Sequence, residues 1–184
     1  IKGGTFNPYD KGFVSGNRNA ASTLRRGIAG SVPHYQINDA KEACWAFEPT
    51  QAVNYCEAHD NNTLWDKLCI SAKNDSEGVR IKMDKLAAAI VILSQGMPFI
   101  QLGQDFLRSK PRILKEGEAP NDVNIYSHDS YNAPDYTNSI KWNRKLEYKE
   151  VFEYYKALIR LRKGSPLFRM YTNCLLYTSP SPRD

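Results

Sequence analysis

Two short runs of β-forming residues, placed on either side of a strongly helical segment, constrain the fold of this chain more than any other feature. The first run covers residues 53–58 (VNYCEA) and ends in a polar turn, and the second covers residues 97–102 (MPFIQL). Between them, apolar residues recur at helical spacing over residues 79–95, and Gly96 and Pro98 supply a stop. A strand, a polar turn, a helix and a second strand are typical of a parallel α/β sheet or barrel. We therefore predict an α/β fold in which both runs are buried strands.

The segments around this unit are assigned from the same kinds of pattern. Residues 1–19 are rich in Gly, Asn and Pro and predict a loop, and residues 20–28 predict a short helix. Residues 106–148 form a long connection with three prolines, and connections of this length in compact domains are usually functional or disordered. A closing helix is predicted over residues 148–163, because its apolar positions share one face and Gly164 then ends it.

Charge and composition disfavour several classes of function. The formal net charge of +5 comes from 25 basic and 20 acidic residues that are interspersed, so a nucleic-acid partner is not expected. The longest apolar stretch, residues 86–93, is far shorter than the roughly 20 residues that cross a bilayer, so no membrane partner is expected either. The four cysteines match no CxxC metal or redox pattern, and we expect free, partly buried thiols.

The C-terminal residues differ in character from the rest of the chain. Their Ser-Pro repeats cannot continue a helix or a central strand. A natural linker would explain them, but the string CLLYTSPSPRD resembles the translated read-through of a sequencing adapter. We therefore expect residues 1–172 to belong to one folded domain and residues 173–184 to form a non-native, disordered tail.

A cluster of titratable and hydrogen-bonding residues, namely Glu57, His59, Asp60 and Asn61, lies at the end of the first predicted strand. Parallel α/β folds bind ligands at the carboxyl ends of their strands, so this turn is the best candidate site. A hydrogen-bonded structural turn explains the same residues, and the pattern alone does not decide between the two. We expect neither a metal nor a cofactor, because no second histidine lies at ligand spacing from His59.

Four ordered blocks of this sequence resemble the type I pullulanases of the α-amylase superfamily. Residues 53–68 (VNYCEAHDNNTLWDKL) are similar to the fourth conserved region of the superfamily in its pullulanase version. The other blocks are residues 6–17 (FNPYDKGFVSGN), 92–110 (ILSQGMPFIQLGQDFLRSK) and 131–142 (YNAPDYTNSIKW). The resemblance covers nearly all of residues 1–172.

This resemblance implies a retaining glycoside hydrolase that cleaves α-1,6 branch linkages in pullulan, amylopectin and related α-glucans on a (β/α)8 TIM barrel. Retention requires a nucleophile and a general acid whose carboxyl groups lie roughly 5 to 5.5 Å apart. The family carries them at the ends of the fourth and fifth barrel strands, and neither segment is present in this chain. We therefore expect a C-terminal portion of the catalytic barrel, with strands seven and eight, that is inactive alone.

The resemblance also implies roles for individual residues. Asp60 matches the catalytic aspartate that stabilises the transition state, and His59 matches a histidine that binds the same sugar. Glu57 is expected to support the site from below, since three strand residues separate it from Asp60 by roughly 10 Å. Further substrate contacts are expected from Asn61, Trp65, Arg108, Asn132, Asp135 and Tyr136. Core packing explains Trp65 equally well, and a solvated surface position explains Arg108 equally well.

Two alternative functions stay open at this point. An isoamylase or another α-amylase superfamily glucanase is the nearest, because linkage preference depends on cleft residues that lie mostly outside this segment. A non-catalytic carbohydrate-binding module is disfavoured, because such modules are usually β-sandwiches and the helical patterns here indicate an α/β fold. The expected partner is an α-glucan, while the oligomeric state and the compartment are not indicated.

Overall fold

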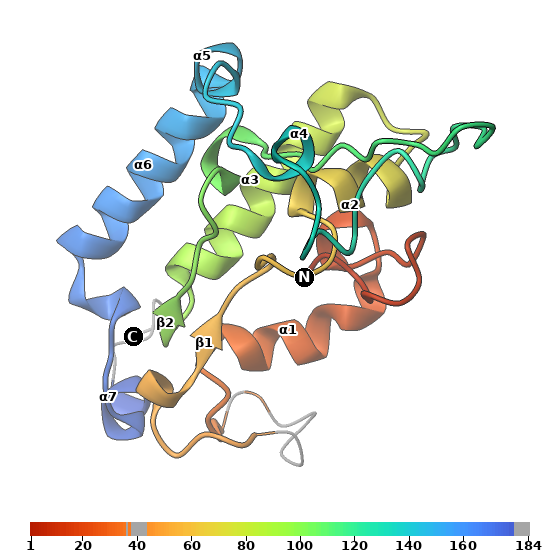
Figure 1. Cartoon of the computed structure of the whole chain (residues 1–184). Coiled ribbons are helices and arrows are strands. Elements are labelled where there is room, and N and C mark those ends of the chain that lie inside the picture. The colour runs from red at the N-terminus through yellow and green to blue at the C-terminus, as the bar shows by residue number, and fades with distance from the viewer. Residues whose placement is uncertain (36, 38–43, 179–184) are drawn as a thin grey trace.

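Two parallel strands and the helices packed on them form the centre of the structure, a computed structural model that describes residues 1–35, 37 and 44–178 (Figure 1). Short 3-10 helices and loops connect the main elements. These elements are α1 (Ala21–Ile28), β1 (Val53–Asn54), α2 (Leu64–Ser71), α3 (Glu77–Leu93), β2 (Met97–Pro98), α4 (Asp135–Asn138), α5 (Arg144–Glu147), α6 (Lys149–Gly164) and α7 (Asn173–Thr178).

The two strands pair in parallel, with Val53 opposite Met97 and Asn54 opposite Pro98. The amide of Met97 donates to Ala52 O at 2.8 Å, and the amide of Phe99 donates to Asn54 O at 2.8 Å. Pro98 has no N–H, but the ladder uses only the amides on either side of it. The predicted α/β class and the parallel pairing are thus confirmed.

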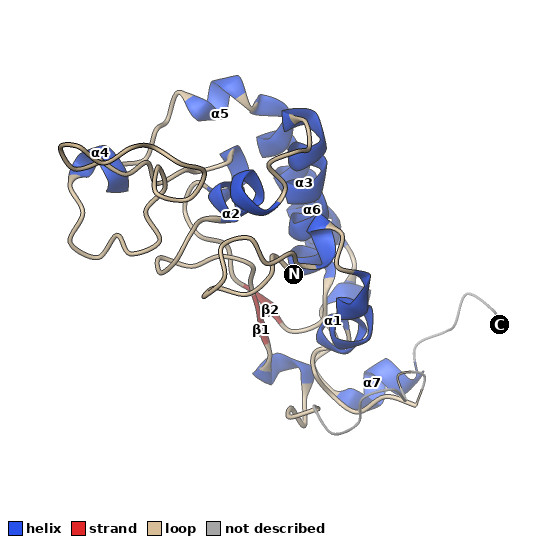
Figure 2. Ribbon diagram, turned by 90° about the vertical axis from the view of Figure 1, so that its right-hand side faces the viewer, coloured by secondary structure: helices blue, strands red, loops and turns tan. Residues whose placement is uncertain are grey.

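The prediction that residues 53–58 and 97–102 are two buried strands is wrong in the extent of the strands and in their burial. Each strand has two paired residues, and only one face of the pair is covered, because α1, α3 and α6 all lie on the same side of it (Figure 2). Successive strand residues point to opposite faces, so burial alternates along the chain. Ala52 and Cys56 are buried, whereas the open face exposes about half of each of four apolar side chains, namely Val53, Tyr55, Met97 and Phe99.

Helix α3 is the central element. It begins at an N-cap, Ser76, whose side chain accepts a hydrogen bond from Val79 N. One side of it packs with α6, in a cluster of Trp65, Ala88, Ile92, Leu107, Val151, Tyr155 and Leu158. The other side packs with α2 and the N-terminal segment, in a cluster of Val14, Cys56, Leu64, Leu68, Ala87 and Val91. The two clusters therefore hold α2, α6 and Cys56, which follows β1, against α3.

Helices α3 and α6 confirm the two helices predicted from periodicity, and α1 confirms the short helix predicted over residues 20–28, with ends displaced by two residues or fewer. Helix α2 was not predicted, and the long connection contains the short helices α4 and α5. Cys56 and Cys69 are free thiols, buried and partly buried as expected. Of the residues predicted to form a disordered tail, Asn173–Thr178 form α7 and residues 179–184 lie outside the described residues. None of the described helices is long and apolar enough to span a membrane.

Candidate functional site

The polar turn predicted after the first strand lies between β1 and α2. Asn61 adopts a left-handed conformation with φ of 62°, which asparagine tolerates better than most residues and which reverses the chain. Thr63 then caps α2, because its hydroxyl oxygen accepts a hydrogen bond from Asp66 N at 3.1 Å. The side chains of residues 59–61 are thereby displayed between a strand end and a helix start.

His59 and Asp60 project from this turn into solvent. His59 Nε2 lies 3.4 Å from Asp60 Oδ1, and the two side chains are 88% and 76% exposed. Asp60 and Asn61 line a pocket of about 350 Å³, whose other polar side chains include Lys2, Thr5 and Glu57. The turn therefore presents a carboxylate, an imidazole and an amide to any ligand in or above this pocket.

Glu57 lies beneath the turn and is only 2% exposed. Its Oε2 accepts a hydrogen bond from Leu64 N, one of the N–H groups at the start of α2 that has no partner within the helix. Burial raises the pKa of Glu57 to about 7, against the opposing effects of the Leu64 N–H and the Lys2 ammonium. Glu57 thus anchors α2 to the end of β1, as a support and not as a displayed group.

The backbone of the turn is held by three side chains that sequence analysis missed. Lys110 Nζ donates to His59 O at 3.1 Å and to Asn61 O at 2.5 Å. Lys2 Nζ donates to Asn62 O at 2.8 Å. With its amide oriented to satisfy both groups, Gln101 donates to Ala58 O at 2.8 Å and accepts from His59 N at 3.3 Å. No local sequence signal identifies these contacts, because the partners are 42 to 60 residues away from the groups they bind.

The remaining predicted site residues do not line the pocket beside Asp60. Asn132, Asp135 and Tyr136 are exposed in the long connection, and Asn132 lines a separate pocket of about 530 Å³ with His128 and Thr137. The structure thus brings His59, Asp60 and Asn61 together, and gathers Asn132, Asp135 and Tyr136 in a second group.

Arg108 and Trp65 have structural surroundings. Arg108 Nη2 donates to Asn138 O at 2.9 Å, at the end of α4, so its guanidinium is neither freely solvated nor paired with a carboxylate in the described structure. Trp65 lies in α2 and not in a loop, and it is buried in the core with Tyr148, whose ring centroid is 6.2 Å away. The packing alternative therefore describes the position of Trp65.

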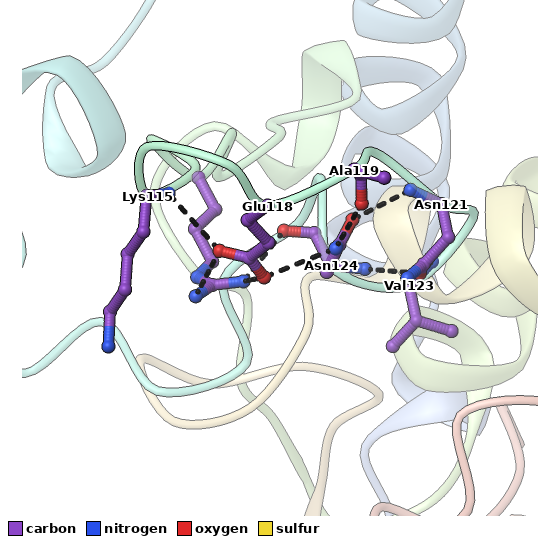
Figure 3. A network of polar contacts seen from close by, with 7 residues as sticks. Lys115, Glu118, Ala119, Asn121, Val123 and Asn124 are labelled. Atoms are coloured by element: carbon purple, nitrogen blue, oxygen red, sulfur yellow. Dashed lines mark hydrogen bonds and ion pairs between the residues drawn. The ribbon is translucent and has the colours of Figure 1, made fainter.

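One wall of the larger pocket is a loop with its own polar network (Figure 3). Arg112 donates to both carboxylate oxygens of Glu118, at 2.8 and 3.1 Å, and Glu118 also accepts from Lys115 N and Asn124 Nδ2. Bidentate pairing of this kind fixes the relative orientation of the two side chains. This loop is closed at its base, where Pro111 and Tyr126 form an antiparallel bridge.

Groups that could hold a metal are absent from the part of the chain that the structure describes, since no three His, Cys, Asp or Glu side chains converge there. The acidic and basic groups of the turn instead suit hydrogen bonding to a polyhydroxylated ligand, because they combine acceptors (Asp60), a donor and acceptor (Asn61) and a titratable ring (His59). Together with the parallel strand pair, this defines an α/β fold with its candidate site at a strand end.

Several proteins that this chain resembles in sequence and in structure are pullulanases. The pullulanase of Bacillus subtilis (strain 168) is 36% identical over 170 residues, which cover 92% of this chain and 21% of the relative. The crystal structure of the type I pullulanase of that organism complexed with maltose matches with a TM-score of 0.78 and 36% identity, covering 93% of this chain and 21% of that one. A variant of the Paenibacillus barengoltzii pullulanase complexed with maltotetraose gives a TM-score of 0.81 at 35% identity, covering 99% of this chain and 26% of that one.

The predicted relationship to the type I pullulanases is confirmed, and this chain is a homologue of part of a pullulanase. It spans about one fifth of the length of the Bacillus subtilis relative. No protein-family model matches the chain.

Proposed function

We propose that this chain is part of the catalytic barrel of a retaining glycoside hydrolase that cleaves α-1,6 branch linkages in pullulan, amylopectin and related α-glucans. The observation that carries this proposal is the similarity to pullulanases over nine tenths of the chain. Two of the related structures hold maltose or maltotetraose, which supports an α-glucan as the substrate.

We assign β1 and β2 to the seventh and eighth strands of a (β/α)8 barrel, with residues 1–172 as the barrel portion. In such a barrel, helices cover the outside of a parallel sheet and side chains from the strands fill its interior. The one-sided cover of helices supports this assignment, and so does the open apolar face formed by Val53, Tyr55, Met97 and Phe99. On this proposal the open face is the part of the strands that contacts the rest of the barrel interior.

Asp60 is proposed as the catalytic aspartate that stabilises the transition state, with His59 binding the same sugar ring. Hydrogen bonds that strengthen as the ring distorts toward an oxocarbenium-like state lower the barrier, because they are stronger in the transition state than in the bound substrate. The exposure of both side chains at a strand end supports these roles. Asn61, Asn132, Asp135 and Tyr136 are proposed as further contacts along the glucan, while the positions of Arg108 and Trp65 give their proposed contacts no support.

The nucleophile and the general acid are proposed to lie outside this chain. Glu57 is the nearest carboxyl group in sequence and lines the pocket beside Asp60, but it is only 2% exposed and its Oε2 accepts from Leu64 N, so we do not propose it as the missing carboxyl group. Asp60 alone cannot supply the pair of carboxyl groups that retention requires. The 184-residue chain by itself should therefore be inactive.

The test uses a full-length chimera, in which residues 1–172 of this chain replace the corresponding segment of the Bacillus subtilis pullulanase. Reducing-sugar release from pullulan is measured, with product analysis for maltotriose. Asp60→Ala should lower kcat/KM by about a thousandfold, equivalent to about 4 kcal/mol. The matched control is Asp122→Ala, which removes an exposed carboxylate that pairs with Lys73 and should leave activity unchanged.

Each outcome of this experiment bears on a different part of the proposal. Full activity in Asp60→Ala would overturn the role of Asp60. A chimera that cleaves amylopectin but not pullulan would move the function to an isoamylase-like enzyme. Hydrolysis by the 184-residue chain alone would show that the catalytic pair is present in it.

A further inference from the structure

Lys110 is a lysine in an unusual position, because its side chain is almost completely buried. Only 1% of the residue is exposed, although lysines are rarely buried unless they are paired. All three N–H donors of its ammonium have acceptors, namely His59 O at 3.1 Å, Asn61 O at 2.5 Å and Ser130 Oγ at 3.2 Å. The ammonium therefore occupies a site built from neutral oxygen atoms.

The three acceptors come from two separate segments of the chain, the turn of residues 59–61 and the long connection. His59 and Asn61 belong to the turn that presents Asp60. Ser130 belongs to the long connection, two residues before Asn132. In the described part of the chain, Lys110 is the side chain that hydrogen-bonds to both segments, so it joins the group around Asp60 to the group around Asn132.

The backbone of Lys110 is fixed as firmly as its side chain. Its amide donates to Asp66 Oδ2 in α2 at 2.8 Å, and its carbonyl accepts from Ser127 N at 2.8 Å. The position of the Lys110 backbone is thus fixed by α2 and by the loop that the Pro111–Tyr126 bridge closes. The turn that the ammonium holds does not fix it. A fixed donor can impose a conformation on the turn, including the left-handed backbone of Asn61.

We propose that Lys110 is a positioning residue that fixes the turn of residues 59–61 relative to residues 130–136 of the long connection. These residues contain the proposed substrate contacts Asn132, Asp135 and Tyr136 and are called the substrate loop below. This inference rests on the proposed function, because it assigns Lys110 an effect on glucan hydrolysis through Asp60 and His59. Lys110 does not contact the substrate. Misplacement of a catalytic group by about 1 Å costs about a hundredfold in rate, which sets the size of the expected effect.

The structure supplies a matched control. Lys67 is also buried, and its Nζ also donates to three oxygen atoms, namely Gly4 O, Asn7 O and Pro8 O. Those acceptors lie in the N-terminal loop, which contributes Thr5 to the pocket beside Asp60 but includes neither the turn of residues 59–61 nor Ser130. Lys67→Met and Lys110→Met therefore remove equivalent ammonium groups, but only the second removes contacts to residues 59–61.

The experiment measures kinetics and amide hydrogen exchange on the chimera and its variants. Lys110→Met should lower kcat/KM on pullulan about a hundredfold, mainly through kcat, and should raise exchange at least about tenfold in the peptide covering residues 55–64. Lys67→Met should raise exchange in residues 4–8 and leave exchange in residues 55–64 unchanged, and because Thr5 in that loop lines the pocket it should lower kcat/KM by less than about tenfold. Ser130→Ala, which removes one acceptor and keeps the ammonium, should lower kcat/KM about threefold to tenfold.

Unchanged exchange in residues 55–64 of Lys110→Met would overturn the proposal, and so would equal losses of kcat/KM in Lys110→Met and Lys67→Met. If Lys110→Met does not fold, full activity of Ser130→Ala would refute the proposed link between the turn of residues 59–61 and the substrate loop. If the unmodified chimera hydrolyses no α-glucan, the proposed function fails, whereas the exchange data still decide whether Lys110 holds the turn.

Discussion

Replacement of Glu57 by glutamine should make this chain more stable above neutral pH. Glutamine keeps an oxygen that can accept the Leu64 N–H bond, but it cannot ionise. Burial raises the pKa of Glu57 from 4.5 to about 7 in the folded chain, so folding favours the protonated form. The stabilising effect of that proton is fully present below pH 4.5 and is lost as pH rises to about 7.

The size of the effect follows from the difference between the folded and unfolded pKa. Each unit of difference corresponds to about 1.4 kcal/mol, so ionised Glu57 costs the folded chain about 3 kcal/mol at pH 8. Glu57→Gln should remove this cost. Urea denaturation followed by tryptophan fluorescence, repeated between pH 4.5 and pH 8.5, measures the free energy of unfolding of both chains.

A second carboxylate provides a control of opposite sign. The guanidinium of Arg112 lowers the pKa of Glu118, so Glu118 stabilises the folded chain at neutral pH and loses that effect as pH falls. Glu118→Gln should therefore lower the free energy of unfolding at pH 7. It should not change the decline of that free energy above pH 5, which we attribute to Glu57. Parallel stability curves for the original chain and Glu57→Gln from pH 4.5 to 8.5 would refute the argument, because they would show that Glu57 ionises equally easily in both states.

Two further predictions concern the end of α3 and are measured by the same denaturation assay. Arg162 donates to Ile92 O, Ser94 O and Gly96 O, so Arg162→Met should cost about 3 kcal/mol, whereas Arg169→Met, at an exposed arginine, should cost less than about 0.5 kcal/mol. Gly96 has φ of 94°, and a Cβ added to it would lie 2.6 Å from Ala52 O, so Gly96→Ala should destabilise the fold by more than about 1 kcal/mol. Gly27 lies in α1 with open space around it, so Gly27→Ala should not destabilise the fold. Equal effects within either pair would contradict the corresponding contact.

Periodicity predicted helices better than it predicted what they bury. The apolar pattern placed α3 and α6, and the residues near its two ends placed α1, because a helix is signalled by its local sequence. Yet Leu86, Ile159 and Leu161 are exposed, while Asp84 and Arg162 are buried. A polar side chain can occupy the core when it has partners, as Arg162 has at the end of α3. Such partners come from other elements, and the local sequence does not contain them.

Helix α2 is a different case, because a sequence signal for it existed. Thr63 and Asp66 have the spacing of an N-cap residue and an acidic residue in the first turn, and the structure shows the corresponding hydrogen bond. The strands were predicted too long, because β-forming residues continue in both runs after the ladder has ended. The pairing stops at Asn54 and Pro98, and the last amide that donates across it is that of Phe99.

The candidate site shows where local prediction stops. His59, Asp60 and Asn61 were identifiable, because polar groups that follow a strand are placed at the sheet edge by the fold itself. A tight turn, however, leaves backbone carbonyl groups without partners, and a buried carbonyl needs a donor. Lys2 and Lys110 supply those donors from the N-terminal segment and from the segment after β2. Nothing in the sequence separates these two lysines from solvated ones, since what distinguishes them is the set of oxygen atoms that the rest of the chain places around them. The exposed side chains of the candidate site could therefore be predicted from sequence, whereas the groups that hold the turn in place require the structure.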